Sequence, residues 1–345
     1  MRTRTRIFAA ALVVAIAAPI AVSQGPVAPA ANGTRVLPST AASYAEYQGH
    51  VTQIMSKELG SAAELNKQVQ TFGSANVNQL SSGWISYGAI LAAQNPEFAE
   101  SVRKADADYG RERMMLAFKN EMSYARTLGG GEAALQAALA VNAHETSRIS
   151  QAGAFVREQS YTMQNVTWGK AKAADPKKTA ATIIQAAGQA KPASDAFQQA
   201  FSAPDLNVVL ASLAASPTTS QSIWDKVTTL AVSAPGNAFL SVSPVVAAPA
   251  TLQVRPGQEG TAHRMLNLGA QHVLMSEQAY ADTTQTTLTD PVSRDCLASA
   301  QEQFFGCVSS ATHNYTLAGC LATKALQMPK DRTNSIGSCM SGLTQ

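Results

Sequence analysis

Residues 96–128 read PEFAESVRKADADYGRERMMLAFKNEMSYARTL. Three consecutive glycines, Gly129, Gly130 and Gly131, come next, and residues 132–173 read EAALQAALAVNAHETSRISQAGAFVREQSYTMQNVTWGKAKA. In both stretches apolar side chains recur at three- and four-residue steps, and charged side chains occupy the other face of the first. The glycine triplet indicates a helix stop with a tight turn. Residues 96–173 therefore predict a long antiparallel helical hairpin.

The composition supports helices on either side of this hairpin. The chain has 345 residues, of which 46% are hydrophobic, 14% are charged and 63 are alanines. This content is too apolar for typical disorder, and alanine favours closely packed helices over a β-sandwich. Asn95-Pro96, Asp175-Pro176 and Asp290-Pro291 each combine an N-cap residue with proline at the first helical position. The expected fold is an all-α helical bundle with further helices at 39–59, 61–72, 77–94, 176–190, 260–281 and 291–310.

Composition changes along the chain suggest its organisation. Residues 24–38 are predicted to be a flexible lead, residues 39–200 a helical domain, and residues 260–345 a second helical region that contains a Thr-rich linker at 282–289. Between them, residues 201–259 form a connecting segment rich in Pro, Ser and Val, with few charges. This segment is interpreted either as a domain boundary and partner-facing surface or as a long loop buried on the bundle.

The N-terminus has the three parts of an export signal. Arg2, Arg4 and Arg6 precede an uncharged run at residues 7–22, and small residues end it near Ser23. The run is shorter than the roughly 20 residues needed to span a bilayer. Residues 1–23 therefore predict a cleaved signal peptide for Sec-type export to the periplasm or the extracellular space.

Cleavage alters the charge of the chain. The chain has 26 basic residues, and three of them are the arginines of the signal. The mature chain therefore has 23 basic and 23 acidic residues, and its net charge is zero. A neutral chain without a basic stripe argues against nucleic acid as a partner. No later stretch approaches transmembrane length, so the mature chain is expected to lack a membrane span.

Four cysteines, Cys296, Cys307, Cys320 and Cys339, lie in the last fifty residues. An even number in an exported chain predicts disulfides, and the spacing lacks the C-x-x-C pairs typical of zinc or haem sites. Helices at 291–310 and 316–327 should form a hairpin that places Cys307 opposite Cys320. The favoured pairing is therefore Cys307–Cys320 with Cys296–Cys339, which gives a disulfide-stapled C-terminal helical cap.

Few residues indicate chemistry. Met265, His272 and Met275 fall near one helical face, where two thioethers and an imidazole suit copper, although a core face with a histidine at its edge is the commoner arrangement. No nucleophile motif is present, and Glu112 and Glu121 are the only acids worth testing as hydrolase groups. No catalytic residue and no cofactor is predicted.

These observations favour a non-enzymatic structural or interaction protein of the bacterial cell envelope, with an envelope protein as its partner. The alternatives are an envelope hydrolase with an unrecognised site and a periplasmic protein that binds a small ligand or metal.

Overall fold

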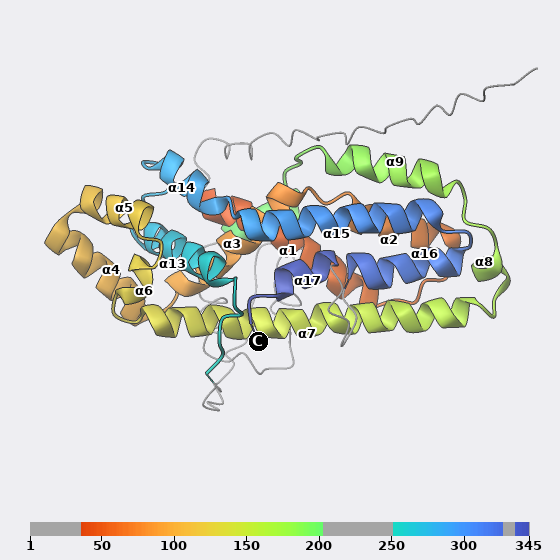
Figure 1. Cartoon of the computed structure of the whole chain (residues 1–345), viewed down its shortest axis with the longest axis horizontal. Coiled ribbons are helices and arrows are strands. Elements are labelled where there is room, and N and C mark those ends of the chain that lie inside the picture. Colours follow the sequence, from red (N-terminus) through yellow and green to blue (C-terminus); the bar gives the residue numbers. More distant parts are fainter. Residues whose placement is uncertain (1–35, 203–250, 327–334, 345) are drawn as a thin grey trace, which may run out of the picture.

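The computed structural model describes residues 36–202, 251–326 and 335–344, and most of these residues are helical. Figure 1 shows an elongated bundle in which α7 (Gly131–Met163) runs along most of the length. The described residues form no strand, only two isolated backbone bridges, Lys172 to His313 and Val254 to Thr344. The all-α prediction is confirmed. The expected signal peptide and most of the connecting segment lie outside the described residues.

The other helices vary from single turns to twenty residues. They are α1 (Val36–Met55), α2 (Ala62–Gly73), α3 (Val77–Ala93), α4 (Pro96–Tyr109), α5 (Arg111–Asn120), α6 (Tyr124–Thr127), α8 (Thr167–Lys170), α9 (Pro176–Ala187), α10 (Asp195–Ser202), α13 (Glu259–Val273), α14 (Ala281–Leu288), α15 (Pro291–Ser310), α16 (Asn314–Cys320), the π-helix η1 (Leu321–Ala325) and α17 (Ile336–Ser341). Within the described ranges, no helix is both long and apolar enough to cross a membrane.

A single hydrophobic core joins the N-terminal and C-terminal parts of the bundle. Its centre is α3, which α1 covers on one side and α13 on another. The backbones approach closely, because a Cβ at Gly83 of α3 would lie 2.9 Å from the carbonyl oxygen of Thr40 in α1. Trp84 and Tyr87 of α3 are fully buried beside this contact. Residues on both sides of the expected connecting segment therefore share one core.

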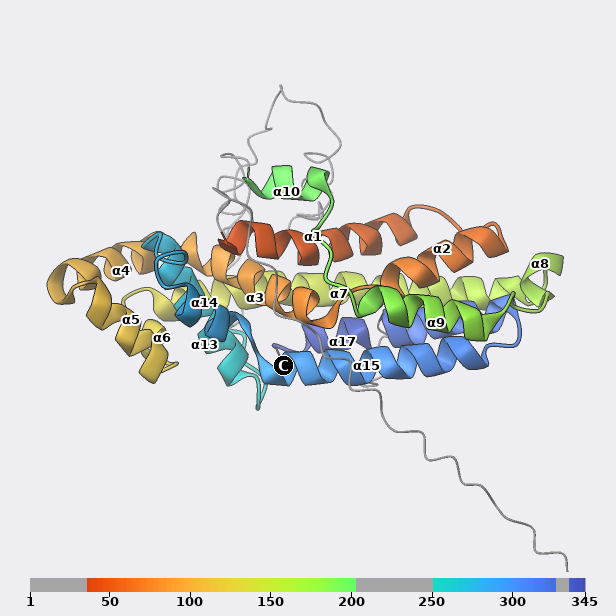
Figure 2. The ribbon, with the colours of Figure 1, turned by 90° about the horizontal axis from the view of Figure 1, so that it is seen from above.

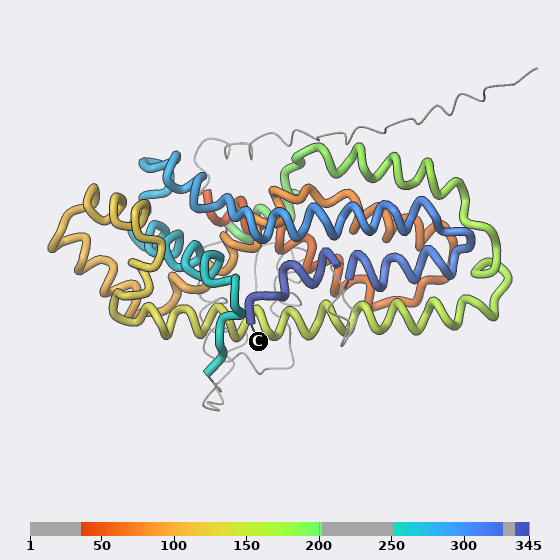
Figure 3. The backbone as a smooth tube through the Cα atoms, in the orientation of Figure 1, coloured from red at the N-terminus to blue at the C-terminus, as the bar shows by residue number. Residues whose placement is uncertain are grey.

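The first arm of the predicted long hairpin is not a continuous helix. It divides into α4, α5 and α6, and Figure 3 shows the chain doubling back between α4 and α5. The reversal occurs at Gly110, which has φ +85° and ψ 149°, a conformation that glycine alone adopts without strain. The Arg111 guanidinium then donates two hydrogen bonds of 2.7 Å to the Asp106 carboxylate across the break. The long antiparallel hairpin is not present, because the first arm forms a compact block at one end.

The glycine triplet does form the expected turn into the second arm. Gly130 has φ +72° and is the residue before α7. A side chain there would overlap the backbone of Glu97 and Phe98 at the start of α4, so the turn requires glycine. The helix ends at Met163 rather than continuing to residue 173.

Capping predictions hold at all three Asn-Pro and Asp-Pro sites. The side chains of Asn95, Asp175 and Asp290 accept hydrogen bonds from backbone N–H groups of α4, α9 and α15, and proline occupies the first turn of each helix. The start of α1 differs from its prediction. It begins at Val36, and the hydroxyls of Ser39 and Thr40 donate to the Val36 carbonyl oxygen instead of capping the helix. The last three residues of the expected flexible lead are therefore helical.

The Thr-rich stretch is also helical, where a linker was expected. In α14 the hydroxyls of Thr286 and Thr287 donate to carbonyl oxygens four residues earlier, at 2.8 Å each. Thr284 is buried and donates to Gln271 Oε1 of α13 at 2.8 Å. Packing against α13 thus outweighs the weak helix propensity of threonine.

Candidate functional site

The structure forms two disulfide bonds at the C-terminus. Cys296 of α15 is bonded to Cys339 of α17, and Cys307 of α15 to Cys320 at the end of α16, with Cα–Cα distances of 5.7 and 5.6 Å. These are the pairs that the hairpin geometry favours. All four cysteines are used, so none offers a free thiol for catalysis or metal binding.

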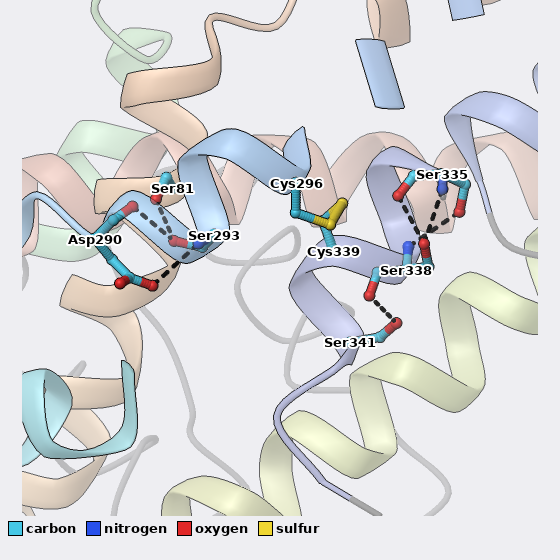
Figure 4. The surroundings of a disulfide bond; sticks show 8 residues. All are labelled: Ser81, Asp290, Ser293, Cys296, Ser335, Ser338, Cys339 and Ser341. Carbon is cyan, nitrogen blue, oxygen red and sulfur yellow. Dashed lines mark hydrogen bonds between the residues drawn. A yellow bond between two sulfur atoms is a disulfide. The ribbon is translucent and has the colours of Figure 1, made fainter. Parts of the chain in front are cut away.

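The segment that carries Cys339 is held by more than its disulfide (Figure 4). Ser335 and Ser338 form a reciprocal capping box at the start of α17, with hydrogen bonds of 2.8 and 3.1 Å. From α7, Asn142 Nδ2 donates to the Met340 carbonyl oxygen at 2.9 Å. The serines around Cys339 therefore cap a short helix, which Asn142 and the disulfide attach to α7 and α15.

Met265, His272 and Met275 do not share one environment. Met265 is buried in the core, where its thioether packs against Gly88 of α3. Met275 lies beyond the end of α13 with 70% of its surface exposed and φ +50°. His272 Nδ1 is 2.6 Å from Glu277 Oε1, and both side chains are largely buried. The structure therefore places one thioether in the core and the other at the surface. The copper hypothesis stays an untested prediction.

Glu112 and Glu121 are both exposed at opposite ends of α5. Nine residues of helix separate the two backbone positions by about 13.5 Å along the axis, whereas the carboxyl groups that cooperate in glycoside hydrolysis lie at most about 9.5 Å apart. Among the described residues, no group of three or more His, Cys, Asp or Glu is placed to hold a metal ion.

A buried polar cluster joins two helices, α1 and α7, and sequence reasoning missed it. Glu145 and Arg148 of α7 are 1% and 6% exposed. The Tyr44 hydroxyl of α1 donates to Glu145 Oε2 at 2.7 Å and accepts from Gln48 Nε2 at 2.6 Å. Arg148 donates to Gln48 Oε1 and, at 3.2 Å, to Thr52 Oγ1. These five side chains are called the α1–α7 polar cluster below.

Electrostatics keeps the tyrosines of this region protonated. The pKa of Tyr44 is raised well above its ordinary value, first by burial and then by the negative charge of Glu145. Burial and the same carboxylate raise the pKa of Tyr87 on α3. Both hydroxyls remain hydrogen-bond donors at physiological pH. Three hydrogen bonds of the cluster join α1 to α7 in the buried interior.

A signal for this cluster was present in the sequence. Buried residues of α7 recur at three- and four-residue steps, and Glu145 occupies one of these positions between Asn142 and Ile149. A carboxylate on an apolar face requires a buried partner. The partners themselves come from α1, about 100 residues earlier, and periodicity does not identify them.

Comparison with known proteins gives no relative. No family model matches this chain, and neither a curated protein nor a solved structure resembles it significantly. A functional assignment therefore depends on the residues and contacts described above.

Proposed function

We propose that this chain is an exported, non-enzymatic structural or interaction protein of the bacterial cell envelope, located in the periplasm or outside the cell. The two disulfides carry this proposal, because such bonds form and persist in oxidising compartments. The N-terminal sequence at residues 1–23 has the composition of an export signal, which agrees with that compartment.

The arrangement of the charged residues supports a scaffold rather than an enzyme. The buried charges of the α1–α7 polar cluster are engaged by other side chains of the fold. Glu112 and Glu121, the candidate hydrolase acids, are exposed and lie at opposite ends of α5. An elongated helical bundle offers long surfaces and two distant ends for partners (Figure 2).

Cross-linking in intact cells of the native host tests the proposal. An amine-reactive reagent has accessible lysines at both ends of the bundle, Lys104 and Lys119 at one and Lys170 and Lys177 at the other. We expect a reproducible envelope protein to be captured, and mass spectrometry of the linked peptides to assign it to one of these surfaces. Recovery of monomer alone would contradict the interaction function and favour the hydrolase or ligand-binding alternatives.

The location is tested separately by the oxidation state of the cysteines. Non-reducing mass spectrometry of the purified protein should show both disulfides and a chain that begins near residue 24. A matched variant that lacks residues 1–23 should stay in the cytoplasm with four reduced thiols. Reduced cysteines in the full-length protein would contradict export.

A further inference from the structure

One end of the bundle carries an excess of exposed lysines. Lys170 ends α8, Lys172 follows it, and Lys177 and Lys178 lie in the first turn of α9. All four side chains are exposed, and Asp175 is the one acid among them. Its carboxylate already accepts a hydrogen bond from the Lys178 backbone N–H at 3.1 Å. Residues 157–178, together with the α15–α16 turn that they contact, are called the basic end below.

The lysines of the basic end are held by a well-packed backbone. Ala173 N donates to the Thr312 carbonyl oxygen at 3.0 Å, and Asn314 N donates to the Ala171 carbonyl oxygen at 3.1 Å. The segment is therefore fixed to the α15–α16 turn, which the Cys307–Cys320 disulfide closes. Figures 1 and 2 both place α8 and the start of α9 at the same extremity of the bundle. The positive charges are thus presented together without an ordering cost for the backbone.

Exposed apolar side chains lie among and beside these charges. Tyr161 is 48% exposed, and Arg157 lies over its ring at 5.8 Å from the centroid. Val166, in the turn between α7 and α8, is 37% exposed. Ile184 is 42% exposed and follows Lys177 by seven residues, so both lie on one face of α9. Aromatic and aliphatic groups next to lysines are typical of surfaces that insert at a membrane interface.

The opposite end of the bundle has many charges but no excess of either sign. In residues 96–127, six acids accompany six bases: Glu97, Glu100, Asp106, Asp108, Glu112 and Glu121 with Arg103, Lys104, Arg111, Arg113, Lys119 and Arg126. Residues 157–178 instead hold five bases and two acids, Glu158 and Asp175. The neighbouring α1–α2 loop adds Glu58, and Lys57 of this loop forms an ion pair with Glu64 of α2. The basic end remains positive with these included.

We propose that the basic end docks the protein on an anionic lipid bilayer. Charge complementarity supplies the attraction, because lysines near a negatively charged leaflet bind favourably without specific contacts. The exposed Tyr161, Val166 and Ile184 distinguish a lipid surface from a soluble acidic protein, since an interface accepts both apolar and cationic groups. This inference rests on the proposed envelope location and names the surface that the protein meets there.

Flotation with lipid vesicles tests the inference on the purified disulfide-bonded protein. Its N-terminus is first read by mass spectrometry, because a retained apolar run at residues 7–22 would itself bind bilayers. Vesicles with 30% phosphatidylglycerol should bind the protein, whereas pure phosphatidylcholine vesicles should not. Raising the salt from 0.1 to 1 M shortens the screening length from about 10 to 3 Å and should release most of it.

A quadruple variant tests the surface itself. It combines Lys170→Gln, Lys172→Gln, Lys177→Gln and Lys178→Gln. Each lysine near an anionic leaflet contributes about fivefold to the partition coefficient, so four such losses multiply to at most several hundredfold, and we expect binding to fall by at least tenfold. The matched control replaces Arg103, Lys104, Arg113 and Lys119 of the other end by glutamine, with the same change in net charge. It should bind within twofold of the unmodified protein, and both variants should melt within about 2 °C of it.

Three outcomes would overturn the inference. They are absence of binding to the anionic vesicles, equal loss in both variants, and retention of the protein by a soluble acidic polypeptide but not by vesicles. None of these would affect the oxidation state of the cysteines or the capture of an envelope partner in cells, so the proposed function is judged independently. Tyr161→Ser provides a second readout, because it should weaken the binding that remains at 1 M salt without changing the salt dependence.

Discussion

The α4–α6 block and the α15–α17 region both pack against α7 and both reverse the chain direction, by different means. In α4–α6 a single glycine and one ion pair, Arg111 with Asp106, set the reversal. In α15–α17 two disulfides join the helices. The reversal in α15–α17 can be predicted from the sequence, because the spacing of the cysteines indicates which helices are cross-linked. The reversal at Gly110 cannot, because the amphipathic pattern of the sequence continues through this glycine.

The largest expected effect comes from a substitution in α7, the helix against which both regions pack. Glu145→Gln keeps the size of the side chain but removes the carboxylate that accepts the Tyr44 hydrogen bond, and it leaves the buried Arg148 as the only charge of the α1–α7 polar cluster. Leaving a buried charge without its counter-charge costs about 3–5 kcal/mol, and hydrogen exchange should accelerate in both regions. Urea unfolding measures the loss. Glu132→Ala, which breaks the exposed Arg126–Glu132 pair on the same helix, should cost less than about 1 kcal/mol.

A smaller effect, confined to α15–α17, is expected from removing each disulfide. Cys296→Ser with Cys339→Ser opens a loop of 43 residues, and Cys307→Ser with Cys320→Ser opens one of 13. The chain-entropy estimate gives losses of about 4 and about 3 kcal/mol. Thermal unfolding of the two double variants checks both the losses and their order. Equal losses, or a larger loss for the shorter loop, would contradict the entropic account.

The same substitution in the two regions should have opposite effects. Gly110→Ala places a side chain in open space but at φ +85°, where the backbone strain costs about 2 kcal/mol. Gly306→Ala also enters open space, but in the interior of the helix α15, where alanine gains up to about 1 kcal/mol. Chemical denaturation of both variants is the measurement. A neutral Gly110→Ala would mean that the α4–α5 turn does not need its glycine.

The smallest effect is a difference in acid sensitivity. Hydrogen bonds from Arg111 hold the pKa of Asp106 below its ordinary value. The folded state therefore gains stability above about pH 4 that is lost as the pH falls further. Asp106→Asn should remove this dependence and cost less than about 1 kcal/mol at pH 7, because the pair is partly exposed.

Hydrogen exchange of α5 at pH 7 and pH 3 would locate this acid sensitivity. The disulfides of α15–α17 do not titrate, so exchange there should not share the Asp106-dependent change. An identical acid response of α5 in the Asp106→Asn variant would count against the role of the ion pair.

Local chemistry explains which features were predictable. Asn95, Asp175 and Asp290 cap their helices as expected, because a cap involves residues within four positions along the chain. The glycine triplet also forms its turn. The break at Gly110 was missed because the apolar period continues through it, and α14 was missed because Thr284 gains its partner, Gln271, from the preceding helix.

The candidate site was less predictable than the fold. The sequence singled out Met265, His272 and Met275, which helical pitch places near one face, yet Met275 lies beyond the end of α13. The α1–α7 polar cluster was not anticipated, although Glu145 stands on an apolar face. The basic end was hidden in a chain whose total charge is balanced, since net charge does not report how charges are distributed in space.

The sequence alone determined the helical class, the caps of α4, α9 and α15 and the pairing order that the cysteine spacing favours, because propensity, capping and short loops act over a few residues. The tertiary structure decided where the long amphipathic stretch folds back, which buried groups face Glu145 and Arg148, and which lysines gather at one end. These features depend on contacts between segments about 100 residues apart or on the path of the backbone around a core. Periodicity along one helix specifies which face is buried, but it does not specify what covers that face.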